Sequence, residues 1–408
     1  MAEIKYLNDE SFQKIIIKLL ESDNLNLLLG AGFSANVLRT LGTMERFMEI
    51  IQKEPHNNKY IRLEAVLYWN FFETSIFPMV TKLNDISVLK EQCEFLSLWQ
   101  QILDIRDTVV LQKQLNIFTT NYDVILELAM ENECIEYNDG FQGLIKPYFS
   151  TSNYNKIYYK QVLFSNRISL LPMFNLYKIH GSITWKSTDR DEKKLIYGNY
   201  ISELQQFYDN QKEIIDDDGR ELLKKVCSLK WDDINKDNID SILKEFECTN
   251  ENKYIDFTST YKKSFKIVNP TKQKFSDTIV NKNYYELLRI YCNELERENT
   301  LLIAYGFSFY DEHIEDLTKR ALNNPSLILI VFSYTDEDKK RFEEKFKFNN
   351  NVWIIGRKEW NENIESSEED EDAELAIEAT TDKNEEKITL KEVNEFLSMV
   401  IKERKENE

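Results

Sequence analysis

The sequence predicts an α/β protein with a doubly wound, Rossmann-like parallel sheet and helical insertions. Two observations support this prediction: short apolar runs alternate with helical patterns, and glycine or polar turns directly follow several of these runs. The apolar runs are residues 25–29, 116–118, 176–179, 265–268, 301–304, 327–332 and 352–355. Strands that alternate with helices form a parallel sheet covered on both faces, and right-handed crossovers bring the carboxyl ends of the strands to one edge.

Two long intervals interrupt the alternation. Residues 35–112 are rich in Phe, Leu, Trp and Glu at helical spacing, and residues 186–262 mix charged helical segments with few strand signals. Both intervals are therefore expected to be largely helical insertions. They belong to one expected domain, which spans residues 1–360.

The composition changes after residue 360. Residues 362–386 hold twelve Asp or Glu and one Lys, a local charge of −11 within a formal net charge of −19. The segment has too few apolar side chains to offset the entropy that it would lose on ordering. Residues 361–387 are therefore expected to be an acidic disordered linker. Residues 388–408 carry an apolar stripe at helical spacing, which predicts an amphipathic helix that docks on the body or on another subunit.

Charge and cysteine content narrow the classes of function. Outside the acidic segment the net charge is only −8, and surfaces that bind nucleic acid or anionic lipid need clustered Lys and Arg, so direct nucleic-acid binding is not expected. The five cysteines are far apart and form no CxxC pair, which favours a reducing cytoplasm. No signal peptide and no apolar stretch of about 18 residues is found, so a membrane location is not expected.

The first candidate motif lies in NLNLLLGAGFSANVL, where Gly30, Ala31, Gly32 and Ser34 follow a strand and precede a helical pattern. Glycines in such a turn let backbone N–H groups approach a pyrophosphate at a helix N-terminus. The motif lacks the third glycine of GxGxxG. A tight turn with Ser34 as the helix N-cap explains it equally well when it is taken alone.

A second strand ends in TTNYD, which brings Asn121 and Asp123 to the same edge of the sheet. Thr119 or Thr120 in this turn is explained by capping of the helix that follows, but the whole cluster is not. A third strand ends in IHGS and places His180 there. A lone histidine is more often structural than catalytic, and it is the position of His180 that makes it a candidate.

The fourth turn lies in LLIAYGFSFYDEHIEDL and contains Gly306 and Ser308. The acidic residues Asp311 and Glu312 then open a helix, where the helix dipole favours negative charge. Together with His313 they could suggest a metal site, but consecutive residues on a helix point in different directions. We therefore expect no metal there.

The segments GAGFS, TTNYD, IHGS and GFS, in this order, resemble the motifs of the sirtuin (silent information regulator) superfamily. Those motifs are a GAG loop, a T-x-N-x-D segment, an HG motif and a late glycine-serine turn. The resemblance runs from about residue 25 to residue 333 and leaves the insertions unmatched. It implies NAD as the substrate.

The resemblance also implies roles for the candidate residues. Gly30, Ala31, Gly32 and Ser34 would hold the NAD phosphates, with Gly306 and Ser308 beside them or beside the adenosine ribose. Asn121 and Asp123 would lie by the nicotinamide ribose and carboxamide, and His180 would be the base near the ribose hydroxyls. An amide and an imidazole suit the cleavage of an N-glycosidic bond, because they can orient water and the ribose as positive charge develops.

The chain departs from deacetylating sirtuins at two places. It lacks the zinc module built on two CxxC pairs, and it reads SANVLRTLGTMERF where a Pro-Asp-Phe-Arg stretch is expected. Both departures argue against peptide deacylation, and no zinc is expected. What remains is similar to the sirtuin-like NAD hydrolases of bacterial anti-phage systems, and GFSFYDEHI is particularly similar to those encoded beside a HerA-like ATPase.

The resemblance thus predicts an NAD glycohydrolase that yields nicotinamide and ADP-ribose and depletes NAD during infection. A homo-oligomer controlled by a HerA-like ATPase is expected, because an unregulated hydrolase would drain NAD from its own cell. ADP-ribosyl transfer to a macromolecule is a second possibility, since it uses the same cleavage with another acceptor. A scaffold that binds NAD or ADP-ribose without turnover is a third, although the presence of both Asn121 and His180 disfavours an inactive site.

Overall fold

A parallel sheet of eight strands lies at the centre of the described residues, in the order β1-β14-β13-β12-β2-β3-β9-β4. The structure is a computed structural model that describes residues 1–39, 44–53, 59–106, 112–161, 163–164, 166, 168–188, 191–229, 233–246, 251–267, 282–357 and 387–407. The strands are β2 (Asn24–Leu29), β3 (Gln114–Thr119), β9 (Met173–Lys178), β12 (Thr300–Tyr305), β13 (Leu327–Phe332), β14 (Val352–Gly356) and the edge strands β1 (Glu3–Tyr6) and β4 (Tyr137–Asn138).

The strand order confirms the predicted fold class. From β2 the chain moves outward to β3 and β9, then returns to β12 on the other side of β2 and continues through β13 to β14. In the numbering of the Rossmann fold this is the order 3-2-1-4-5-6. The direction of winding reverses between β2 and β12, and the crevice at such a switch point is the usual ligand site of open α/β sheets.

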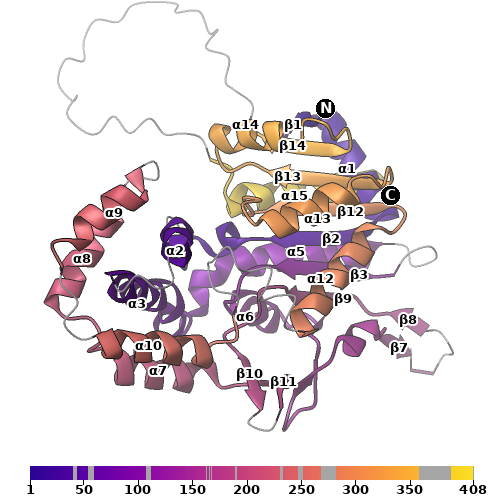
Figure 1. Cartoon of the computed structure of the whole chain (residues 1–408). Coiled ribbons are helices and arrows are strands. Elements are labelled where there is room, and N and C mark those ends of the chain that lie inside the picture. Colours follow the sequence, from indigo (N-terminus) through magenta and orange to yellow (C-terminus); the bar gives the residue numbers. More distant parts are fainter. Residues whose placement is uncertain are drawn as a thin grey trace, which may run out of the picture.

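Helices cover both faces of the sheet (Figure 1). The strands are apolar along almost their whole length because each face is buried. One face packs against α12 (Lys282–Leu295), α13 (Glu312–Ala321) and α14 (Asp336–Lys345). The other face packs against α1 (Glu10–Ser22), α5 (Lys90–Ile105), α6 (Ile125–Asn132) and α15 (Leu390–Asn407).

The two intervals predicted as insertions pack against each other beside the sheet. The first contains α2 (Met44–Gln52), α3 (Lys59–Phe71), the π-helix η2 (Phe72–Ile76), α4 (Pro78–Lys82), η3 (Ile86–Leu89) and α5. The second contains α7 (Tyr200–Gln211), α8 (Asp217–Cys227), α9 (Lys236–Leu243) and α10 (Glu251–Ser264). Trp69 stacks on Tyr208, and Phe72 packs on Phe207, so aromatic contacts join the two intervals into one helical lobe.

Two features differ from the sequence-based expectation. The second interval begins with a hairpin of β10 (Trp185–Thr188) and β11 (Asp191–Tyr197), which extends a small antiparallel sheet with β5 (Phe141–Gln142) and β6 (Tyr148–Phe149). The strand predicted at residues 265–268 is wrong over its described part, where only Ile267 makes a single bridge to Gly181. Phe265 packs in the helical lobe against Phe72, so packing of its side chain, not sheet pairing, determines the path there.

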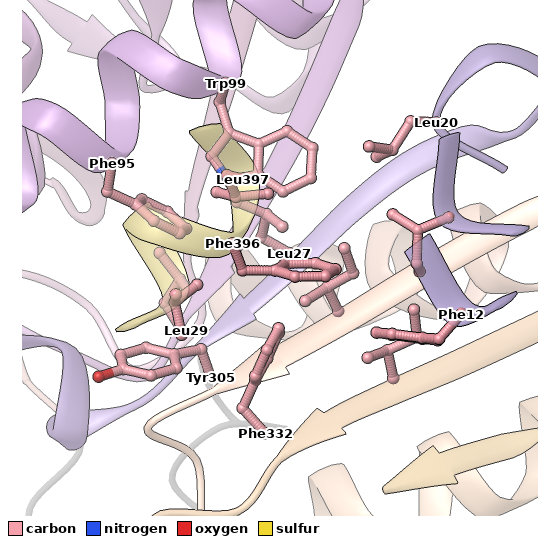
Figure 2. A pocket seen from close by; sticks show the side chains of 14 residues that line it. Phe12, Leu20, Leu27, Leu29, Phe95, Trp99, Tyr305, Phe332, Phe396 and Leu397 are labelled. Carbon is pink, nitrogen blue, oxygen red and sulfur yellow. The ribbon is translucent and has the colours of Figure 1, made fainter. Parts of the chain in front are cut away.

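The C-terminal helix α15 docks on the body of its own chain, which was one of the two expected outcomes. Figure 2 shows Phe396 and Leu397 of α15 among Phe12, Phe95 and Trp99, side chains of α1 and α5. The Phe12 and Phe396 rings are stacked with centroids 5.6 Å apart. The space left among these side chains is about 10 Å³, close to one water molecule, so this contact is a packed core.

The predicted acidic linker, residues 361–387, lies outside the described residues except for its last residue. Where the description resumes, the Ile388 N–H donates to the Tyr334 carbonyl at 3.1 Å, after β13. The segment that leads into α15 is therefore held close to the carboxyl edge of the sheet. None of the helices that the structure describes is both long enough and apolar enough to cross a membrane.

Candidate functional site

Four turns at the carboxyl edge of the sheet form a closed ring of contacts. They follow β12, β2, β3 and β9, which are neighbours in that order. The turns after β12 and β2 touch through their backbones, those after β2 and β3 through side-chain hydrogen bonds, and those after β3 and β9 through the Ile183 N–H, which donates to the Tyr122 carbonyl at 3.1 Å. The ring closes where His180, after β9, meets Asp311, after β12.

The glycines at the switch point allow the turns after β2 and β12 to approach each other closely. The Gly32 N–H donates to the Gly306 carbonyl at 2.9 Å, and the Gly30 N–H donates to the Tyr305 carbonyl at 3.1 Å. A Cβ on Gly30 would lie 2.4 Å from the Gly306 carbonyl oxygen, and one on Gly32 would lie 2.5 Å from the Gly306 Cα. Loop-to-loop packing is thus a sufficient reason for glycine at these positions, with or without a bound phosphate.

Gly306→Ala should lower the free energy of unfolding by at least about 2 kcal/mol, because two penalties combine. Gly306 has a φ of +63°, which disfavours a side chain, and its Cβ would lie 2.5 Å from the Phe33 nitrogen. Urea denaturation measures the effect. Gly143→Ala is the matched control, since Gly143 has a φ of +107° but only a 3.2 Å contact to the Lys146 oxygen. Equal losses in the two variants would show that loop packing adds nothing.

Asn121, Ser34 and Asp123 form one buried polar network between the turns after β2 and β3. Asn121 Nδ2 donates to the Gly30 carbonyl at 2.9 Å and to Ser34 Oγ at 3.2 Å, and Ser34 Oγ donates to Asp123 Oδ2 at 2.8 Å. The three residues are between 4% and 6% exposed. Because both amide hydrogens are used, Oδ1 is the atom with which Asn121 could accept a hydrogen bond from a ligand.

The structure also decides between two local explanations of these motifs. Ser34 is not a helix N-cap: Gly30 precedes the short 3₁₀ helix η1 (Ala31–Ser34), and the Ser34 hydroxyl points to Asp123. Thr119 does not cap the following helix either. Its hydroxyl accepts from the Asn121 N–H at 3.0 Å and donates to the Leu29 carbonyl at 2.8 Å, so it stabilises the turn itself. The Asp123 side chain accepts from the Ile125 N–H at the start of α6.

His180 is held by Asp311 above the ends of β2 and β3. The distance from His180 Nε2 to Asp311 Oδ2 is 3.1 Å, and the side chains are only 11% and 7% exposed. Strands in a sheet are about 4.8 Å apart, so the ends of β9 and β12 are separated by roughly 14 Å. The turns that carry His180 and Asp311 must therefore reach over the two strands between them. Nε2 faces a carboxylate, which leaves Nδ1 as the nitrogen that can accept a proton.

Asp311 contacts His180 and also caps the helix that follows its turn. Its Oδ1 accepts from the His313 and Ile314 N–H groups and caps α13, while its Oδ2 faces His180. Two residues earlier, Phe309 has a φ of +54° and is completely buried. This left-handed conformation is unfavourable for a bulky side chain, and such strain is concentrated at functional sites.

A cavity of about 520 Å³ opens at the switch point. Its lining includes Gly32, Gly306 and Ser308 from the candidate motifs, together with Arg341 of α14 and Glu91 of α5. Its volume falls within the usual range for small-molecule sites, about 300–1,000 Å³. Asn121 and His180 do not line this cavity, so of the predicted site residues it unites mainly those assigned to phosphate or adenosine.

The start of α15 and the two residues before it contribute a further wall of this cavity, through Ile388, Thr389 and Leu390. A guanidinium, a carboxylate and backbone groups around one cavity match the chemistry of a nucleotide, since arginine binds phosphate and carboxylates bind ribose hydroxyls. Arg341 itself pairs with Asp338 at 2.6 Å and lies over the Tyr310 ring. Of the remaining predicted residues, Ala31 is exposed at the start of η1.

A buried ion pair lies beneath the turn after β3. Lys178 Nζ is 2.7 Å from Glu127 Oε1, with the side chains 4% and 6% exposed, and it also donates to the Asp123 carbonyl. Burial raises the pKa of Glu127 to about 7, against the opposing effect of Lys178. The pair supports the peptide of Asp123 from below and therefore helps to position the network of Asn121, Ser34 and Asp123.

The raised pKa of Glu127 predicts how stability changes with pH. The folded protein holds the Glu127 proton more tightly than the unfolded chain does. The stabilisation of the folded state that results is therefore fully present at low pH. It is lost as the pH rises from about 4.5, the ordinary value, to about 7. Across this window wild type should lose on the order of 1 kcal/mol or more relative to Glu127→Gln, which does not titrate. Urea denaturation of both proteins between pH 4.5 and pH 8 tests this, and parallel curves would contradict it.

The sequence did not reveal four residues that contribute to this edge: Asp311 as the partner of His180, Arg341 in the cavity, and the pair of Lys178 and Glu127 below it. The sequence indicated Asp311 only as an acidic residue that opens a helix, and nothing in the spacing linked it to a residue 131 positions earlier. Among the described residues no group of three or more His, Cys, Asp or Glu could hold a metal ion.

Comparisons with known proteins add no family to this description. No protein-family model matches the chain, and no curated protein matches it. The resemblance to sirtuins therefore stays a prediction from the four sequence motifs.

Proposed function

We propose that this chain is an NAD glycohydrolase that cleaves NAD to nicotinamide and ADP-ribose. The observation that carries the proposal is the His180–Asp311 contact, which holds an imidazole beside the switch point of a Rossmann-like sheet. The cavity at the same switch point, lined by Gly32, Gly306, Ser308 and Arg341, supports a dinucleotide as the substrate.

The chemistry needs few groups from the protein. Nicotinamide is a cationic pyridinium in NAD, so it leaves with the bonding electron pair as a neutral molecule and requires no acid. Positive charge develops on the ribose, and water adds to C1′. The water proton passes to His180 Nδ1 and then to solvent, and ADP-ribose keeps the new hydroxyl. Asp311 stabilises the resulting imidazolium, and Asn121 Oδ1 could orient the water or the ribose.

Product analysis tests this proposal. The full chain is incubated with NAD labelled in the adenosine part, and products are separated by chromatography. Equal amounts of nicotinamide and free ADP-ribose are expected. Label on protein or nucleic acid would indicate ADP-ribosyl transfer instead of hydrolysis. The absence of any product under all conditions would indicate a protein that binds NAD without cleaving it. A binding protein has no need of an imidazole oriented by a buried carboxylate, so turnover is favoured.

The proposed reaction needs no metal, because the leaving group is already activated. The purified protein should therefore contain less than one zinc per chain, and treatment with a chelator should leave NAD cleavage unchanged. Elemental analysis and the cleavage assay measure the two quantities on the same sample. One tightly bound zinc that is lost together with activity would favour a deacylase instead.

The proposed setting is anti-phage defence in the cytoplasm, with activity controlled by contacts between chains. A homo-oligomer and a HerA-like ring ATPase are the proposed partners, on the basis of the resemblance of GFSFYDEHI. Phe71 of the helical lobe packs against Tyr122 in the turn after β3, and the segment at Ile388 lines the cavity, so a small displacement of either would alter the site. Sedimentation and NAD cleavage with and without the ATPase test this proposal, which a monomer with one unchanging rate would contradict.

A further inference from the structure

A row of asparagines crosses the sheet at the amino-terminal half of its strands, away from the turns described above. Asn26 on β2, Asn116 on β3, Asn175 on β9 and Asn138 on β4 are register partners in successive strand pairs. The four residues are between 1% and 9% exposed. Strands buried on both faces are normally continuous apolar runs, so a row of buried amides needs a separate reason.

The hydrogen bonds along this row have a defined direction. Asn116 Nδ2 donates to Glu294 Oε2 at 3.1 Å and to Asn26 Oδ1 at 3.0 Å. A carboxylate only accepts, so the orientation of the Asn116 amide is determined, and its Oδ1 must accept from Asn175 Nδ2, at 3.0 Å. The Asn175 Oδ1 then faces away from Asn116. Within the described part of the chain, this buried oxygen has no hydrogen-bond partner.

Asn175 lines a cavity of about 610 Å³ on the face of the sheet that α12 covers. The floor is formed by β3 and β9, and the walls are formed by α12 and the short helix η4 (Thr151–Asn155). Polar groups dominate the lining, which includes Asn116, Glu294 and the hydroxyls of Thr151 and Ser152. A buried acceptor without a partner is unfavourable by about 1–3 kcal/mol, and a ligand that donates a hydrogen bond would remove this penalty.

Two arginines line the same cavity as the Asn175 oxygen. Asn175 lies at the floor, Arg289 lies on α12, and Arg297 lies just after the end of that helix. The arginine side chains are 52% and 48% exposed. Arg289 pairs with Glu286, and Arg297 pairs with Glu294. A guanidinium has five N–H groups, so one carboxylate leaves donors for a second anion.

We propose that this cavity binds a small phosphorylated compound, with its phosphate at Arg289 and Arg297 and its hydroxyl or amino donors at Asn175 and Glu294. A nucleoside monophosphate and a sugar phosphate share this chemistry. The site uses none of the residues assigned to NAD cleavage, and it lies at the opposite end of the strands. It therefore stands or fails independently of the proposed function.

Isothermal titration calorimetry on the full chain tests the site with AMP, ribose 5-phosphate, adenosine and inorganic phosphate as probes. At least one of the two phosphorylated compounds should bind about tenfold or more tightly than adenosine and inorganic phosphate, since the arginines and Asn175 both contribute hydrogen bonds. Whichever of AMP and ribose 5-phosphate binds more tightly shows whether the site prefers a nucleotide or a sugar phosphate.

Variants show which of the two cavities binds the phosphorylated compound. The double substitution Arg289→Gln with Arg297→Gln should weaken it by at least about tenfold. Arg341→Gln, which removes a guanidinium from the cavity at the switch point, should leave it unchanged. Asn175→Leu should also weaken it, and circular dichroism shows whether that variant folds. Arg220→Gln, an exposed arginine on α8, is the surface control.

Three results would overturn the proposal. In the first, neither phosphorylated compound binds at millimolar concentration. In the second, inorganic phosphate binds as tightly as both compounds, which would mean an adventitious anion only. In the third, binding disappears in Arg341→Gln and persists in the double arginine variant, which would place the compound at the switch point. The double arginine variant should fold even if Asn175→Leu does not, because both arginine side chains are about half exposed.

Discussion

His180→Ala should lower the rate of NAD cleavage by about two orders of magnitude or more, the usual contribution of a positioned acid or base. The imidazole is the group that can take the proton of the attacking water, and its Nε2 is already committed to Asp311. A coupled assay for free nicotinamide measures kcat and KM. The variant should still fold, but its melting temperature should fall, because the buried Asp311 carboxylate loses its contact with the imidazole. Near-normal turnover of the folded variant would remove His180 from the mechanism.

Asp311→Asn separates the two roles at this contact. The amide keeps the size of the side chain but loses the charge that stabilises the imidazolium, so kcat should fall while KM changes little. An effect on both constants together with a large loss of stability would indicate that Asp311 acts only as the cap of α13. His313→Ala is the matched control, since His313 follows Asp311 closely and should leave cleavage close to the wild-type rate.

Asn121→Ala should also lower NAD cleavage by about two orders of magnitude, for a different physical reason. Its Nδ2 ties the Gly30 carbonyl and the Ser34 hydroxyl to the turn after β3, so the variant loses both the tether and the amide oxygen. Ser34 and Gly30 would keep buried polar atoms with fewer partners, and the melting temperature should fall as well. The nicotinamide assay and differential scanning calorimetry measure the two effects.

The neighbouring threonine provides the control for this experiment. Thr120→Ala changes the same turn without touching the network of Asn121, Ser34 and Asp123, so both activity and melting should stay near wild type. Asn121→Asp keeps the shape but replaces the donating amide with a carboxylate next to Asp123. It should fail like Asn121→Ala if the donated hydrogen bonds matter. Full activity in Asn121→Asp would contradict a positioning role for the amide.

Local patterns were sufficient to predict the architecture. The apolar runs at β2, β12, β13 and β14 are strands because buried parallel strands need apolar side chains on both faces, and this requirement is visible in the sequence itself. The edge strands β1 and β4 were not predicted, since strands of four and two residues carry too little pattern. The run at residues 265–268 failed because a short apolar run does not distinguish a strand from a packed loop.

The candidate site was predictable only in part. Parallel winding places the carboxyl end of every strand on the same side of the sheet, so it predicts one common edge for Gly30, Asn121, His180 and Gly306. It does not predict which side chains make contact there. The pairing of His180 with Asp311 crosses two intervening strands, and the hydrogen bond of Ser34 to Asp123 replaces the capping that its position suggested.

By itself, the sequence determined the class of fold, the strands around the switch point and the four turns that carry the candidate residues. These features depend on short stretches whose propensities and periodicity act locally. Only the tertiary structure decided the pairing of His180 with Asp311, the docking of α15 on its own chain, and the row of asparagines at the floor of a polar cavity. Each of these joins segments far apart in the chain, and such contacts depend on packing and strand register rather than on any local pattern.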